Sequence, residues 1–159
     1  MKQYLSLTVV AVALMLSSTT LRAHEHHAPH KGTLVEFGEE FAHLELVIDQ
    51  TTGKVSAYVL DGEAEKAVRV AQEEIEIKVS AGTTAGSGPV VGFTVPLKAQ
   101  ASVLSGEKVG DTSEFAGQND MLKNLPAFDA IVTKITVKGK TFEAVKFNFP
   151  KGNEEEAKK

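Results

Sequence analysis

Apolar and polar residues alternate most regularly over residues 41–48 and again over residues 54–60. This period of two is typical of half-buried β-strands, because successive side chains of a strand point to opposite faces. A polar turn that ends in Gly53 joins the two segments, so together they predict a β-hairpin in which Ile48 faces Val55. We expect one face to be buried, through Leu44, Leu46, Val55, Ala57 and Val59, and the other to carry His43, Glu45 and Tyr58.

The carboxyl-terminal third predicts a second hairpin. Two apolar segments flank Lys138-Gly139-Lys140, which is typical of a tight turn. Pro96 near the end of an earlier apolar segment favours a strand end or an edge at that point. Core candidates in the returning strand are Phe142, Val145 and Phe147. The strands expected outside the first hairpin are residues 33–37, 67–71, 74–80, 90–97, 128–137 and 141–149.

Two other stretches carry weaker signals. Val103 and Leu104 favour a further strand, whereas residues 81–88 are rich in glycine and predict a loop. Residues 118–125 favour one or two helical turns that end before Pro126. About seven or eight short strands at this spacing are typical of an all-β fold. We therefore predict a single antiparallel sandwich or barrel-like domain.

The first 23 residues match the layout of a secretory signal peptide. Lys2 precedes an apolar run over residues 5–16, and Ala23 offers a small residue before a cleavage point. The alternative, a retained membrane anchor, is disfavoured because the run is shorter than the roughly 20 residues that a membrane-spanning helix needs. The predicted organisation is a signal peptide (1–23), a flexible His-rich arm (24–32), a β domain (33–150) and a charged disordered tail (151–159). The expected location is the periplasm or the outside of the cell.

Composition narrows the possible partners. The full chain carries a formal net charge of −4, and removing residues 1–23 takes away Lys2 and Arg22 but no acidic residue. An acidic chain without a basic stripe disfavours binding to nucleic acid or to anionic membrane surfaces, and no membrane insertion is expected after signal removal. There is no cysteine, which excludes disulfides and lipid attachment through a terminal cysteine.

The sequence lacks the common patterns of catalytic sites. It contains no G-x-S-x-G, no H-E-x-x-H and no glycine-rich loop between a strand and a helix. Acidic residues are frequent, but none is marked as a pair for acid–base chemistry. We therefore expect a protein that is not an enzyme and that has no organic cofactor.

Histidines are concentrated at the start of the predicted mature chain. Four of the five histidines are His24, His26, His27 and His30. Imidazole is a common ligand of Cu²⁺, Ni²⁺ and Zn²⁺, whereas Cu⁺ prefers sulfur and Met121 is the only methionine after residue 23. If cleavage follows Ala23, the new amine, two backbone amides and the His26 ring can form a square-planar site for Cu²⁺ or Ni²⁺. The alternatives are an adaptable capture arm and a solvated, weakly metal-binding tail.

His43 is separate from this cluster and shares a strand face with Glu45. One interpretation is that both residues lend ligands to a metal that the arm brings, which makes His43 a fifth candidate ligand. The other is an ordinary, exposed polar face. We favour the exposed face, because paired polar residues are common on solvated strands.

Four segments within residues 32–62 are similar to segments of known proteins. These four segments are Gly32-Thr33-Leu34-Val35-Glu36-Phe37-Gly38, Ala42-His43-Leu44-Glu45-Leu46-Val47, Thr52-Gly53-Lys54 and Ala57-Tyr58-Val59-Leu60-Asp61-Gly62. This pattern resembles small exported, mostly uncharacterised bacterial periplasmic proteins. Residues 26–70 also resemble a segment of the periplasmic adaptor subunits of heavy-metal efflux pumps, although the long coiled-coil hairpin of an adaptor is missing. The resemblance implies a periplasmic role near transition-metal handling, with an efflux-pump component as a candidate partner.

Two functions from different classes remain open at this point. The first is a periplasmic transition-metal-binding protein that captures or delivers Cu²⁺, Ni²⁺ or Zn²⁺ through His24, His26, His27, His30 and His43. The second is a non-catalytic structural or partner-binding β domain of the cell envelope, in which the His-rich arm is incidental. Binding of a transition-metal ion distinguishes them.

Overall fold

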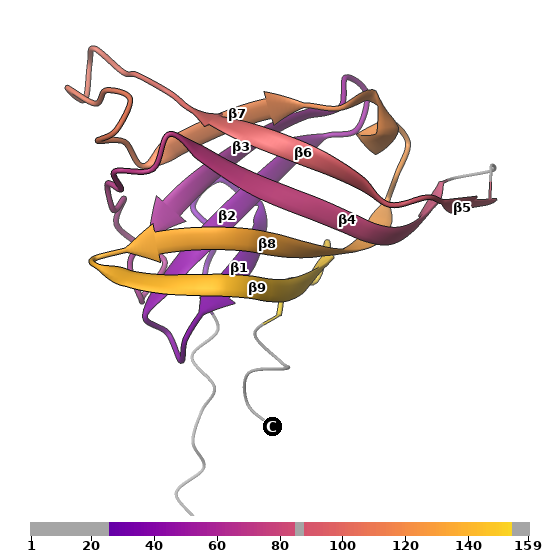
Figure 1. The fold of residues 1–159 in the computed structure, drawn as a ribbon, viewed down its shortest axis with the longest axis horizontal. Coiled ribbons are helices and arrows are strands. Elements are labelled where there is room, and N and C mark those ends of the chain that lie inside the picture. The colour runs from indigo at the N-terminus through magenta and orange to yellow at the C-terminus, as the bar shows by residue number, and fades with distance from the viewer. Residues whose placement is uncertain (1–25, 85–87, 154–159) are drawn as a thin grey trace, which may run out of the picture.

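The protein folds into one strongly curved antiparallel β-sheet (Figure 1). The computed structural model describes residues 26–84 and 88–153. The strands are β1 (Thr33–Phe37), β2 (Ala42–Asp49), β3 (Lys54–Leu60), β4 (Glu74–Thr84), β5 (Gly88–Val90), β6 (Phe93–Ala99), β7 (Glu114–Gln118), β8 (Ala127–Val137) and β9 (Lys140–Phe149). A short 3-10 helix, η1 (Asp120–Leu122), lies between β7 and β8. Among the described residues, no helix is both long and apolar enough to cross a membrane.

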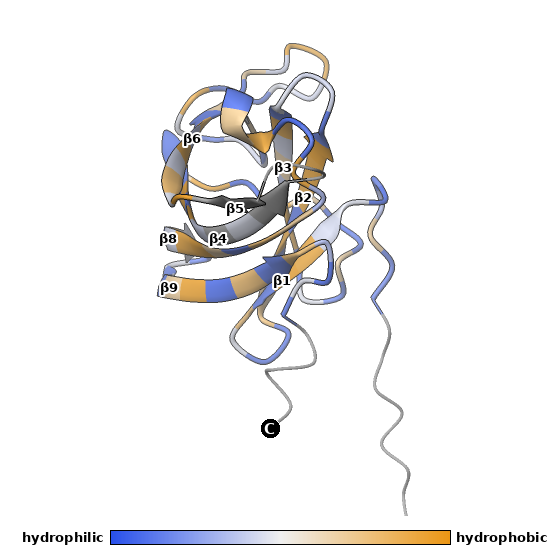
Figure 2. Ribbon diagram, turned by 90° about the vertical axis from the view of Figure 1, so that its right-hand side faces the viewer, coloured by the Kyte–Doolittle hydropathy of each residue, from blue (hydrophilic) through white to orange (hydrophobic). Residues whose placement is uncertain are grey.

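The sheet curls into a nearly closed barrel. Its strand order is β1-β2-β3-β7-β6-β4-β8-β9, with β5 attached to β4. In Figure 1 the strands β4, β6, β8 and β9 form the near wall, and β1, β2 and β3 lie behind them. Figure 2 shows β9 next to β1, with hydrophobic and hydrophilic residues mixed along β9. The all-β, barrel-like class expected from the alternation is confirmed.

A turn after β9 covers the seam between the first and last strands. The side-chain amide of Asn153 accepts the Glu36 N–H at 2.7 Å and donates to the Glu36 carbonyl at 3.1 Å, as a neighbouring strand would. The Thr33 hydroxyl donates to the Pro150 carbonyl at 3.1 Å. Residues 151–153 were predicted to begin a disordered tail. In the structure they belong to the fold, because the unpaired backbone groups of an edge strand need partners.

The first hairpin has the predicted register. Ile48 pairs with Val55 and Glu45 pairs with Tyr58. The predicted inner face is buried in the core at Leu44, Leu46, Val55, Ala57 and Val59. Gly53 closes the turn at a φ of +72°, and a Cβ there would lie 2.4 Å from the Asn119 carbonyl oxygen. Glycine is therefore required both for the backbone conformation and for the close approach.

The second hairpin is also confirmed. Val137 pairs with Lys140 across a two-residue turn in which Lys138 and Gly139 both have positive φ, at 48° and 79°. This combination matches the type I′ turn that fits the twist of β-hairpins. Of the three core candidates, Phe147 is buried, whereas Phe142 and Val145 are half-buried and pack against the core.

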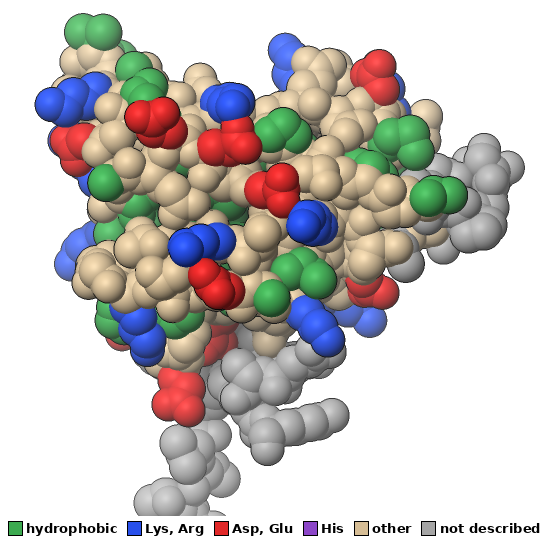
Figure 3. Space-filling model, in the orientation of Figure 1, with side chains coloured by type: hydrophobic (Ala, Val, Ile, Leu, Met, Phe, Trp, Pro, Cys, Tyr) green, Lys and Arg blue, Asp and Glu red, His purple; other side chains and the backbone are tan. Residues whose placement is uncertain are grey.

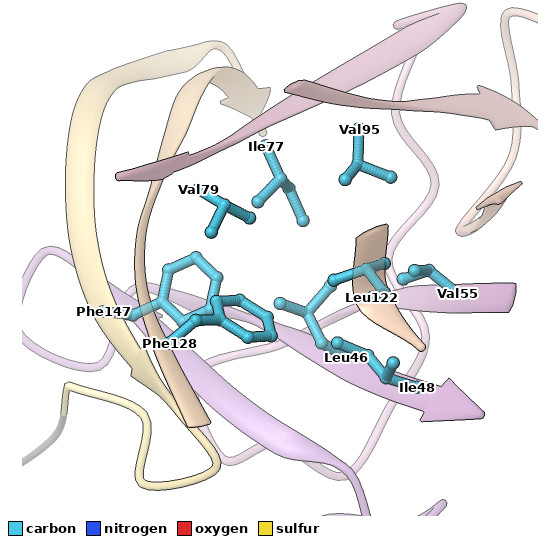
Figure 4. A pocket seen from close by; sticks show the side chains of 9 residues that line it. All are labelled: Leu46, Ile48, Val55, Ile77, Val79, Val95, Leu122, Phe128 and Phe147. Carbon is cyan, nitrogen blue, oxygen red and sulfur yellow. The ribbon is translucent and has the colours of Figure 1, made fainter. Parts of the chain in front are cut away.

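Apolar side chains fill the barrel interior. Figure 4 shows the end near η1, where Leu122 lies among side chains from the barrel strands. The gap left between these side chains is only ≈ 10 Å³, about the size of one water molecule, so the interior is a packed core rather than a ligand cavity. The residues that line it are Leu46, Ile48, Val55, Ile77, Val79, Val95, Leu122, Phe128 and Phe147.

Two strand predictions were wrong. Val103 and Leu104 lie in a turn and are 97 % and 102 % exposed, because Gly106 and Gly110 fold this segment into a loop closed by isolated bridges. Residues 67–71 form only single bridges, at Ala67 and Val70, rather than a strand. The helical turns predicted over residues 118–125 reduce to η1.

The outer surface carries charges of both signs. Figure 3 shows basic and acidic side chains interspersed on one face, with the hydrophobic ones in small separate groups. Lys134 pairs with Glu143 at 3.2 Å, and Lys98 pairs with Glu74. Exposed pairs of this kind contribute little to stability.

Candidate functional site

The described part of the arm, residues 26–32, packs on the face of β2 and β3 that points away from the barrel core. His43 and Glu45 on that face are completely buried. The preferred expectation of an ordinary exposed polar face was therefore wrong. Strand alternation does put these side chains on the outer face, but the arm then covers them.

A small apolar cluster anchors the arm beside these polar residues. Leu34, Leu60 and Ala64 form it outside the main core, and Ala28 and Tyr58 pack against it. The arm turns back at this point, where the Lys31 N–H donates to the Ala28 carbonyl at 3.0 Å. The arm thus has its own hydrophobic contact, which favours docking over free solvation.

Gly32 lets the arm approach the sheet closely. A Cβ at this position would lie 2.6 Å from the Leu46 carbonyl oxygen and 2.8 Å from Cγ of Glu45. Real Cβ atoms do not approach other atoms so closely, so any other residue would push the arm outward. The same approach allows the Gly32 N–H to donate to Oε1 of Glu45 at 2.8 Å.

Glu45 holds the arm through three hydrogen bonds. Besides the Gly32 N–H, its Oε1 accepts the His30 N–H at 2.7 Å, and its Oε2 lies 2.8 Å from Nδ1 of His30. The side chain of Glu45 is 0 % exposed, whereas that of His30 is 44 % exposed. A buried carboxylate is costly unless it is hydrogen-bonded, and these three donors offset the cost.

The His30 ring is also fixed by stacking. It lies on Tyr58 with ring centroids 3.8 Å apart and an interplanar angle of 14°. Tyr58 is the cross-strand partner of Glu45. Glu45 therefore contacts a ring nitrogen of His30, while Tyr58 stacks on the face of the same ring.

His43 is oriented by the loop that follows β3. Its Nδ1 lies 3.1 Å from the Asp61 carbonyl oxygen. A carbonyl can only accept, so Nδ1 carries a hydrogen in this contact. Partial burial opposes ionisation of the Asp61 carboxyl, but hydrogen bonds from the N–H groups of Lys66 and Glu65 outweigh it and hold its pKa below the ordinary value.

The arm brings a second imidazole to His43. The rings of His26 and His43 have centroids 4.7 Å apart and are tilted by 55°. His43 belongs to β2 and His26 to the arm, so this contact exists only when the arm is docked. His26 is half-buried in this position.

The predicted ligands therefore fall into two places rather than one cluster. His26 meets His43, while His30 is held by Glu45 and Tyr58. His27 is exposed to solvent, and His24 lies outside the described residues. Within residues 26–84 and 88–153 there is no group of three or more histidine, aspartate or glutamate side chains that could hold a metal ion.

Sequence reasoning did not find the contributions of Glu45 and Asp61. The shared face of His43, Glu45 and Tyr58 was predictable from alternation, but the covering arm depends on contacts 13–15 residues away in sequence. Asp61 acts on His43 through its backbone carbonyl, which no residue type reveals. Comparison with protein-family models, curated proteins and solved structures found no match to this chain.

Proposed function

We propose that this protein is a periplasmic transition-metal-binding protein that captures or delivers Cu²⁺, Ni²⁺ or Zn²⁺. His26 and His43 are the central ligands, and His24 and His27 in the arm supply further ones. The observation that carries the proposal is the 4.7 Å separation of the His26 and His43 rings. His30 serves mainly to anchor the arm.

The ring separation matches what a shared ion requires. A metal–nitrogen distance of about 2.0–2.1 Å puts the centre of a ligating imidazole about 3.2 Å from the ion. Two such rings at an angle between about 90° and about 109° have centres about 4.5–5.2 Å apart. The observed separation of 4.7 Å lies within this interval and is therefore compatible with one ion between the two rings.

The hydrogen bond to His43 supports the same role. Histidines that bind metals generally donate their other ring N–H to a carboxylate or a carbonyl, which fixes the tautomer and the ring orientation. The Asp61 carbonyl gives His43 this support through Nδ1. This contact orients the His43 ring so that Nε2 is the nitrogen that a metal ion would bind.

Two imidazoles leave an ion's coordination incomplete. His24 and His27 stand within two residues of His26, so chain connectivity allows their rings to reach the same ion. Imidazole suits Zn²⁺, Cu²⁺ and Ni²⁺ alike. The absence of cysteine and the single methionine after residue 23 disfavour Cu⁺ as the cargo.

The location and the partner of the proposed function rest on the sequence. The pattern of residues 1–23 favours export, and the resemblance of residues 26–70 to adaptor segments of heavy-metal efflux pumps favours an efflux-pump component as the partner. The protein would then act without an organic cofactor or a catalytic step.

Isothermal titration of the chain lacking residues 1–23 with Cu²⁺, Ni²⁺ and Zn²⁺ tests the proposal. His43→Asn is the informative variant, because an asparagine amide can still donate to the Asp61 carbonyl but lacks the second ring nitrogen. We expect saturable binding by the parent chain and weaker Zn²⁺ binding by His43→Asn and by His26→Asn. Absence of saturable binding tighter than about 30 μM, or about 6 kcal/mol, would refute the proposed function.

A further inference from the structure

We infer that Glu45 is a positioning residue for the proposed metal site: its carboxylate docks the arm so that His26 meets His43. This inference rests on the proposed function, because it assigns Glu45 a part in metal binding although Glu45 is not itself a ligand. Its consequence is that docking of the arm and binding of the ion are one coupled equilibrium.

The hydrogen bonds of Glu45 are concentrated on the arm. Among the described residues, all three of its donors belong to the arm, two from His30 and one from Gly32. If the arm left, this carboxylate would lose its three protein partners together. The buried charge therefore favours the docked arm, because water must otherwise replace all three hydrogen bonds.

The geometry links this contact to the pair of imidazoles. His43 lies two residues before Glu45 on the same face of β2, and His26 lies four residues before His30 in the arm. Between the two contacts, the arm is shaped by the turn from Ala28 to Lys31 and by the packing of Ala28. Fixing His30 at Glu45 therefore limits where His26 can lie.

Linkage makes the effect reciprocal. An ion that bridges His26 and His43 ties the arm to β2 at a second point. If docking raises the affinity for the ion by some factor, the ion must stabilise docking by the same factor. Ordering the arm in advance also reduces the entropy lost on binding.

Trypsin offers a direct measure of docking. In the chain that lacks residues 1–23, Lys31 is the first site for this protease, and the bond that follows it includes the Gly32 N–H that Glu45 accepts. A docked arm should resist cleavage there, because a protease binds an extended, freely accessible segment. The rate is followed by mass spectrometry of the released peptide 24–31.

The test compares the parent chain with Glu45→Gln, which replaces one acceptor oxygen with an amide that itself donates. We expect faster cleavage after Lys31 and weaker Zn²⁺ binding in Glu45→Gln, with the two fold-changes multiplying to about ten, the size of one lost charged hydrogen bond. Saturating Zn²⁺ should slow cleavage of the parent chain. Equal cleavage rates together with equal Zn²⁺ affinities in the two chains would overturn the inference.

Glu107→Gln is the matched control. Glu107 is also a nearly buried carboxylate, and its Oε1 accepts both the N–H and the hydroxyl of Ser113, at 3.0 Å and 2.6 Å. Within the part of the chain that the structure describes, none of its hydrogen-bond or ion-pair partners belongs to the arm. This variant should lose stability without faster cleavage after Lys31 and without weaker Zn²⁺ binding. A similar loss in both variants would mean that general destabilisation explains the result, and the inference would fail.

Two further outcomes separate the inference from the proposed function. If Glu45→Gln does not fold, Gly32→Ala tests the same docking from the side of the arm, because its Cβ would meet the Leu46 carbonyl. If the parent chain binds none of Cu²⁺, Ni²⁺ and Zn²⁺, the proposed function fails, and the trypsin comparison alone then decides whether Glu45 positions the arm.

Discussion

Glu45 and Tyr58 face each other across the β2–β3 ladder, and together they hold His30 by a hydrogen bond and by ring stacking. This pair turns an ordinary hairpin face into a docking surface for the preceding segment of the chain. The inner face of the same hairpin builds the core, so one element supports both the fold and the candidate site. Because the core residues and the site residues lie on opposite faces of this hairpin, substitutions can perturb the core and the site separately.

The core assignment predicts a large loss of stability for Leu46→Ala. Leu46 is completely buried in the barrel interior, and deleting a buried leucine side chain typically costs about 2–5 kcal/mol. Leu104→Ala, at a fully exposed leucine, is the matched control and should cost less than about 0.5 kcal/mol. Urea unfolding at neutral pH measures both, and equal costs would contradict the assignment of faces.

Much of the β2–β3 hairpin was predictable from the sequence, because the alternation of polar and apolar residues that identifies it is a local pattern. A period of two identifies a strand from a few residues, and a short turn then fixes which residues face each other, as Ile48 and Val55 do. The same reasoning failed for Val103 and Leu104. There, apolar composition without alternation favoured a strand, but neighbouring glycines with positive φ fold the segment into a loop.

The candidate site was predictable only in part. Its residue types were identified, since His26, His30 and His43 were candidates from their chemistry. Their pairing was not, because it depends on a turn in the arm and on the space that Gly32 leaves above Leu46. Such contacts join segments with no periodic relation to each other, so no pattern along the chain reports them.

The turns of the two hairpins predict different losses of stability when their glycines are replaced. Gly53→Ala combines a positive φ with a Cβ 2.4 Å from the Asn119 carbonyl oxygen, and should cost more than about 2 kcal/mol. Gly139→Ala also has a positive φ, but nothing lies within 4 Å of its added Cβ, so about 1 kcal/mol is expected. Thermal or urea unfolding of both variants compares them. A smaller loss for Gly53→Ala would show that the turn can shift away from Asn119.

Asp49, in the turn between β2 and β3, predicts a loss of stability in acid. Hydrogen bonds from the hydroxyl groups of Thr51 and Thr52 hold the pKa of the Asp49 carboxyl well below its ordinary value. A depressed pKa means that its contribution is present above the unfolded-state value of about 3.9 and is lost as the pH falls below it. Unfolding at pH 5 and pH 3 should therefore show a larger acid-induced loss for the parent chain than for Asp49→Asn. Equal losses would show that this carboxyl does not contribute.

The last prediction distinguishes two ways of binding Cu²⁺ that both use His26. In a chain that begins at His24, the terminal amine, two backbone amides and the His26 ring can form a square-planar site. Adding one glycine before His24 makes His26 the fourth residue and destroys that site, but it leaves the contact between His26 and His43 unchanged. We therefore expect the added glycine to weaken Cu²⁺ and Ni²⁺ binding and hardly to change Zn²⁺ binding, because Zn²⁺ prefers tetrahedral ligands and does not readily displace amide protons.

His43→Asn should give the opposite pattern, with Zn²⁺ binding weakened and the terminal Cu²⁺ site retained. Visible absorption of the Cu²⁺ complex is the measurement, since a square-planar nitrogen site absorbs at shorter wavelength than a pair of imidazoles. If the spectra with and without the added glycine are identical, and both change in His43→Asn, then Cu²⁺ binds between His26 and His43, because only that site depends on the docked arm rather than on the position of the amine. The terminal site would then be excluded.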